Sequence, residues 1–176
     1  MTIRYKIPDK KNAFSIIEAS KKDMDFTLTL KLSEKSGPTI VRNIYECFRM
    51  LGDALLVAKG IQSEDHIGPI KELLKLKVDT SRPIYLIDNL RKLRHNINYY
   101  GYSPKLVEVE DVISLAKSCF EPLHDAVMKE VKKESWLKTK KTNLKIKTKV
   151  DNSKLNWFWR ITIKWYFFPI FYYTEA

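Results

Sequence analysis

Residues 38–60 read PTIVRNIYECFRMLGDALLVAKG, and this stretch decides the fold class of the chain. Its apolar residues recur at intervals of three and four, which places them on one face of an amphipathic helix. That face consists of Ile40, Ile44, Cys47, Leu51, Ala54 and Ala58 and is widened by Val41, Phe48 and Leu55. Pro38 suits the first turn of a helix, and Gly60 suits the left-handed residue at which many helices end. We therefore predict a helix that begins near Pro38 and ends at Gly60.

The neighbouring segments repeat this helical pattern. Asn12 can cap a first helix, which the Ser36-Gly37-Pro38 turn stops. A shorter helix is expected around residues 64–77. A fourth helix has Pro83 near its start and Gly101 at its end. Its apolar stripe is formed by Leu86, Leu90, Leu93, Ile97 and Tyr100.

A fifth helix is expected after the Ser103-Pro104 turn, and Pro122 should kink or divide it. The connections between these helices are short, which favours an all-α fold: an up-and-down bundle of four to five helices. Residues 1–131 show no strand alternation and no glycine-rich phosphate loop. This argues against a Rossmann sheet and an OB barrel.

The charge of the chain is unevenly distributed. The formal net charge is +11, which hints at a polyanionic partner. Residues 1–131 hold 21 basic and 18 acidic side chains, a net charge of +3. Residues 132–176 hold 11 basic and 3 acidic side chains, a net charge of +8. We therefore expect a helical bundle at residues 1–133 and a basic, aromatic appendage at residues 134–176.

Three interpretations of the appendage remain open. Residues 144–150 alternate lysines with other residues, and residues 157–168 alternate an apolar-aromatic set with a mixed one. This pattern predicts a β-hairpin, while its composition also fits a poorly ordered segment or one that is not native to the domain. Its lysines and aromatics could contact single-stranded nucleic acid or an anionic membrane surface.

The cysteines and the N-terminus indicate a cytoplasmic protein. Cys47 and Cys119 both fall on apolar helical stripes, so buried free thiols are expected rather than a disulfide or a zinc site. The N-terminus has no apolar run of signal-peptide length. Residues 155–173 are apolar, but they include charged residues and a proline that a membrane span tolerates poorly. No metal or cofactor is expected.

One face of the predicted fourth helix carries side chains that could bind RNA and transfer a proton. At about 100° per residue, Arg91, Arg94, His95 and Asn98 share a face away from the apolar stripe, with Tyr99 at its edge. Guanidinium groups bind phosphates, and an imidazole can transfer a proton near neutral pH. Such a patch could hold an RNA backbone and activate a 2′-hydroxyl. The alternative is an ordinary solvated helix face.

Two stretches resemble the HEPN (higher eukaryotes and prokaryotes nucleotide-binding) family of helical bundles. Residues 55–66, LLVAKGIQSEDH, look like the end of the family's second helix and its following loop. Residues 93–102, LRHNINYYGY, are similar to its motif of arginine, a polar residue, three further residues and histidine. Arg94 matches the arginine and His95 the polar residue, while Tyr99 stands where the family has histidine. The resemblance spans roughly residues 10–131.

The resemblance implies a site at this helix and a homodimer in which the motif helices pair. In the HEPN family members that are ribonucleases, the motif arginine and histidine act at the RNA. The resemblance therefore implies Arg94, His95 and Tyr99 as the candidate catalytic residues. Tyrosine is a poor substitute for histidine as a base, because its unperturbed pKa is about 10. The candidate nucleic-acid-binding residues are Arg91, Arg94, His95, Asn98 and Tyr102.

Three functions follow as hypotheses. The leading one is a HEPN-like protein that binds RNA, a nucleotide or a partner protein in a toxin–antitoxin or RNA-processing context, with weak or no nuclease activity. The second is a metal-independent endoribonuclease toxin. The third is a purely structural partner of a nucleotidyltransferase.

Overall fold

The helix α2, Gly37–Lys59, lies at the centre of the described structure. The computed structural model describes residues 3–63 and 67–133, which all belong to one compact unit. Proline occupies the first turn of α2, and Gly60 ends the helix with a left-handed φ of 73°. Both ends were predicted from the sequence. The predicted apolar face is buried, and Tyr45 and Leu56 are buried beside it.

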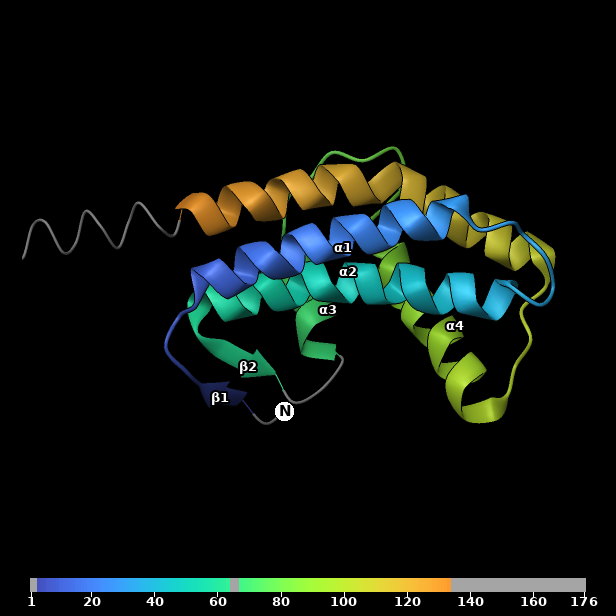
Figure 1. Ribbon diagram of the computed structural model, residues 1–176, viewed down its shortest axis with the longest axis horizontal. Helices are drawn as coiled ribbons and strands as arrows, with labels where there is room; N and C mark the ends of the chain where they lie inside the picture. The colour runs from blue at the N-terminus through green and yellow to red at the C-terminus, as the bar shows by residue number, and fades with distance from the viewer. Residues whose placement is uncertain (1–2, 64–66, 134–176) are drawn as a thin grey trace, which may run out of the picture. The chain divides into compact units, whose positions relative to one another are not determined.

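The helix α1, Lys10–Thr29, runs antiparallel to α2 (Figure 1). The buried hydroxyl of Ser20 donates a hydrogen bond to the backbone oxygen of Cys47 at 2.9 Å, which joins the two helices. The N-cap of α1 is Asp9, whose Oδ1 accepts a hydrogen bond from the backbone N–H of Asn12 at 2.9 Å. The predicted cap at Asn12 was therefore wrong by one turn.

A long helix at residues 106–133 lies beside α1, and both pack against α2 (Figure 1). The rings of Phe48 and Phe120 meet edge to face, with their centroids 5.8 Å apart. Lys21 of α1 forms an ion pair with Glu121. Pro122 does not divide the helix, which continues unbroken to residue 133. Tertiary packing thus holds together a helix that the proline was expected to interrupt.

A small sheet and a short helix cover the end of α2. The strand β1, Ile3–Tyr5, pairs antiparallel with β2, Ile61–Ser63, and the sequence showed no sign of either. The helix α3, Ile67–Leu73, ends before the predicted end near residue 77. It approaches α2 so closely that a Cβ on Gly52 would lie 2.1 Å from the backbone oxygen of Pro69. Glycine at position 52 therefore permits this contact.

The helix α4, Leu86–Tyr100, packs against α2 and buries Ile87, Leu90 and Ile97. It ends as predicted at Gly101, which has a left-handed φ of 63° and whose N–H donates to the backbone oxygen of Asn96. The described residues are thus mostly helical, which confirms the all-α class.

Other expectations concern chemistry rather than packing. Cys47 and Cys119 are buried free thiols, and burial raises the pKa of Cys47 to about 12. Across residues 3–63 and 67–133, no three His, Cys, Asp or Glu side chains gather as metal ligands would. None of the helices described has both the length and the apolar character needed to cross a bilayer. The predicted hairpin and the apolar segment 155–173 lie outside the described residues.

Candidate nucleic-acid interface

The last two turns of α4 form the candidate site. Of the residues from His95 to Tyr100, Ile97 alone is buried, and it anchors this part of the helix to the core. The other five side chains are exposed: His95, Asn96, Asn98, Tyr99 and Tyr100. The structure therefore presents imidazole, amide and phenol groups together on a rigid element.

Three rings gather at this end of α4. The rings of His95 and Tyr99 are tilted by 38° with centroids 4.6 Å apart, as expected for side chains one turn apart. The ring of Tyr100 meets His95 edge to face at 5.7 Å. Tyr99 and Tyr100 remain 64% and 75% exposed. We call His95, Tyr99 and Tyr100 the ring cluster, and it offers aromatic surface to solvent.

Arg94 lies at the boundary between this cluster and the core. Its Cζ lies 5.4 Å from the ring centroid of Tyr45, a residue of α2 that is only 1% exposed. Burial raises the pKa of Tyr45, and the charge of Arg94 opposes that rise. Within the part of the chain described, Arg94 has neither a carboxylate partner nor a hydrogen-bond acceptor. Its guanidinium is therefore held in place without being neutralised.

Arg91, one turn earlier, is engaged differently. Its Nε donates to Asp88 Oδ1 at 2.8 Å, and Lys92 Nζ lies 3.7 Å from the other oxygen of that carboxylate. The hydrogen bond from Arg91 lowers the pKa of Asp88. Arg91 is thus already held in an ion pair, which weakens it as a phosphate clamp.

Tyr102 is separate from the ring cluster. Its hydroxyl donates to Glu108 Oε2 at 2.8 Å, and this hydrogen bond raises the pKa of Tyr102. Its backbone N–H donates to Asn96 O at 3.2 Å. The side chain is therefore directed toward the 106–133 helix, and in the described structure it makes no ring contact with His95.

The structure brings together only part of the predicted patch. His95, Asn98 and Tyr99 share the exposed side of α4, whereas Arg94 is half-buried against α2. Tyr100, assigned to the apolar stripe by its spacing, is exposed and belongs to the ring cluster. Sequence reasoning missed Tyr45 because its contact with Arg94 depends on how two helices pack.

Nothing in this arrangement pairs His95 with a residue that would tune it as a base. No side chain or backbone group described here hydrogen-bonds to its ring, whose neighbours are the two tyrosine rings. The geometry suits stacking and charge contacts more than proton transfer.

Comparisons of the chain with protein-family models, with curated proteins and with solved structures found no match in any of the three.

Proposed function

We propose that this chain is a HEPN-like protein that binds single-stranded RNA at the C-terminal end of α4, with weak or no nuclease activity. One observation carries the proposal: an exposed ring cluster lies on the same two turns of helix as Arg94, whose charge no described carboxylate compensates. A toxin–antitoxin or RNA-processing setting remains part of the proposal through the family resemblance.

The chemistry of these groups fits unpaired nucleotides. Bases of a single strand are free to stack on exposed aromatic rings, and stacking contributes about 1–3 kcal/mol per base. The N–H groups of Arg94 can donate two hydrogen bonds to the oxygens of one phosphate. The exposed amide of Asn98 can hydrogen-bond to a base edge or to a ribose.

Several features favour binding over cleavage. Tyr99 stands where the family has histidine, and a phenol is a poor general base at neutral pH. Arg91, the other candidate clamp, is paired with Asp88. A homodimer that pairs two α4 helices would double the ring surface, and we include this dimer in the proposal.

Fluorescence anisotropy with a labelled single-stranded RNA in EDTA tests the proposal on the full chain. Replacing both Tyr99 and Tyr100 by alanine should weaken binding about tenfold, since at least one stacked base is lost. Tyr85→Ala is the matched control, because Tyr85 is 64% exposed at the opposite end of the same helix. It should bind as the unaltered chain does.

Other results would overturn the proposal. RNA cleavage in EDTA that Arg94→Ala abolishes would establish the endoribonuclease instead. No measurable affinity at low salt would favour the purely structural partner of a nucleotidyltransferase. Unchanged binding by the double tyrosine variant would remove the ring cluster from the account.

A further inference from the structure

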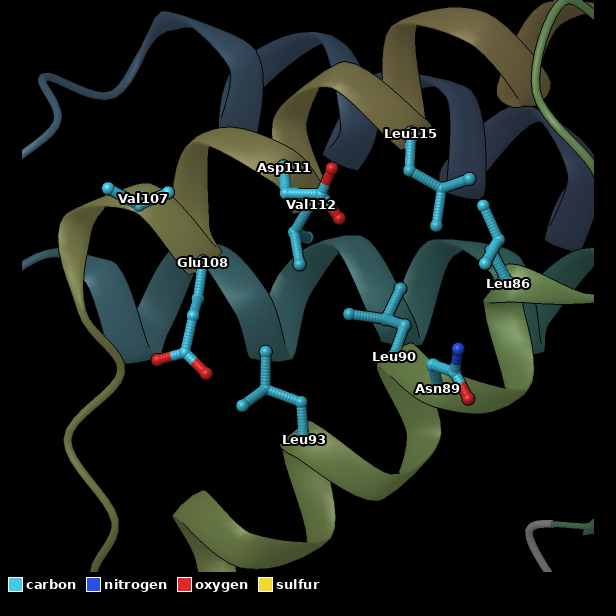
Figure 2. A pocket seen from close by; sticks show the side chains of 9 residues that line it. All are labelled: Leu86, Asn89, Leu90, Leu93, Val107, Glu108, Asp111, Val112 and Leu115. Atoms are coloured by element: carbon cyan, nitrogen blue, oxygen red, sulfur yellow. The ribbon is translucent and has the colours of Figure 1, made fainter.

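A cavity lies between α4 and the first turns of the 106–133 helix (Figure 2). Its volume is about 480 Å³, within the range of about 300–1,000 Å³ that is common for small-molecule sites. Six apolar side chains form most of its wall, and three polar ones lie among them. The lining residues are Leu86, Asn89, Leu90, Leu93, Val107, Glu108, Asp111, Val112 and Leu115.

The polar part of this cavity has one sign of charge. Two of the nine lining residues are acidic, and none is basic. Asp111 is paired with Arg82, whose Nη2 lies 2.9 Å from its Oδ1. Glu108 has no cationic partner among the residues described. The uncompensated charge of the cavity therefore belongs to Glu108.

The carboxylate of Glu108 is fixed in position. Its Oε2 accepts hydrogen bonds from the hydroxyl of Tyr102 and from the backbone N–H of Lys105, both at 2.8 Å. Its Oε1 has no partner in the described structure. Figure 2 shows the carboxylate of Glu108 beside Leu93, in the gap between the two helices. The helix N-terminus, equivalent to about half a positive charge, offsets only part of this carboxylate.

We propose that this cavity binds a small organic cation, with a primary ammonium group and an apolar body. The ammonium donates to Glu108 Oε1, and the leucine and valine side chains enclose the hydrocarbon part. An anion would meet the uncompensated carboxylate of Glu108, with no basic side chain among the lining residues. A neutral molecule of the same shape would lose the charge-assisted hydrogen bond.

The site is distinct from the proposed RNA surface. The lining residues of α4 lie between positions 86 and 93, whereas the ring cluster lies between positions 95 and 100, and none of its three rings lines the cavity. The cavity can therefore be occupied whether or not the ring cluster binds RNA. Failure of one proposal leaves the other intact.

Titration of the isotope-labelled full chain with hexylamine, hexanol and hexanoate, followed by amide NMR, tests this proposal. Hexylamine should shift the amide resonances of Asn89, Leu93 and Val112 and should bind most tightly of the three. Glu108→Gln removes the negative charge, so it should weaken the binding of hexylamine about threefold and leave the binding of hexanol unchanged. Glu110→Gln is the control, because this exposed acid does not line the cavity.

A second variant tests the cavity in a different way, in case Glu108→Gln does not fold. Asn89 is exposed at the cavity, so Asn89→Phe should block binding of hexylamine while the circular dichroism of the helices stays unchanged. Equal binding of hexylamine and hexanoate would overturn the proposal. So would resonance shifts confined to residues outside the cavity, or the absence of any shift.

Discussion

The guanidinium of Arg94 lies over the ring of Tyr45, with Cζ 5.4 Å from the ring centroid. The contact joins α4 to α2 at the place where the exposed end of α4 begins. A cation over an aromatic face contributes about 0.5–2 kcal/mol, more where water is excluded. Because Tyr45 is buried, we expect this contact to set the position from which Arg94 meets a ligand.

Removing the ring beneath Arg94 should weaken RNA binding without abolishing it. We expect Tyr45→Leu to lower the affinity about threefold, because the guanidinium loses the face that orders it. Tyr45→Phe keeps the ring and should bind RNA more tightly than Tyr45→Leu. Anisotropy gives the affinities, and circular dichroism checks that both variants are folded. Equal affinities for the two variants would show that the ring does not position Arg94.

The two arginines of α4 should differ in the salt dependence of RNA binding. Each phosphate contact on a single strand contributes about −0.7 to the slope of log K against log salt. Arg94→Ala should flatten the slope by about that amount. Arg91→Ala should change it less, because Arg91 is already paired with Asp88. Lys22→Ala is the control, since this exposed lysine lies on α1.

The opposite order would contradict the structure. A slope that responds to Arg91→Ala and not to Arg94→Ala would mean that the ion pair with Asp88 opens on binding. A slope unchanged by both variants would place the phosphate contacts elsewhere in the chain.

Glu72 should make stability depend on pH. Burial alone would raise its pKa, but hydrogen bonds from Lys59 and Lys75 outweigh this and lower it. Because the pKa is lower in the folded chain, the ion pairs stabilise the fold above the unfolded value of about 4.3. That stability is lost as the pH falls through the lowered pKa.

Glu72→Gln should therefore cost about 1 kcal/mol at pH near 7, and less in acid. Urea unfolding of the variant and of the unaltered chain, near pH 7 and again in acid, measures this difference in the free energy of unfolding. Glu110→Gln, at an exposed acid with no described ion pair, is the control and should change stability little. A penalty for Glu72→Gln that is equal at both pH values would exclude the ion pairs as its cause.

The first turn of α1 offers a test of its cap. Asp9→Ala should destabilise the chain by about 1 kcal/mol, because the N–H of Asn12 loses its acceptor. Asn12→Ala removes only an exposed side chain and should have little effect. Thermal unfolding of the two variants measures this contrast. A larger loss for Asn12→Ala would restore the cap that the sequence pattern favoured.

Periodicity predicted the elements whose causes are local. The apolar stripe of α2 and the glycines at positions 60 and 101 act within a few residues, so the helix and its end could be read directly. The β1–β2 pair was missed because each strand has three residues and gains its partner from a distant segment. Such short strands show no alternation that a pattern could reveal.

The candidate site was predicted only in part, for a similar reason. Spacing on one helix correctly put His95 and Tyr99 one turn apart. Spacing could not predict that Arg94 contacts Tyr45 of α2 or that Tyr100 is exposed. Both depend on how α4 packs against α2. The pairing of Arg91 with Asp88 was available in the sequence at a spacing of three, and charge counting overlooked it.

Mapping the RNA contact on the full chain tests the central claim most directly. Adding a short single-stranded RNA to isotope-labelled protein should shift the amide resonances of Arg94, His95, Asn98, Tyr99 and Tyr100. Those of α1 and of Tyr85 should stay in place. Resonance shifts that fall elsewhere and spare the last two turns of α4 would contradict the account.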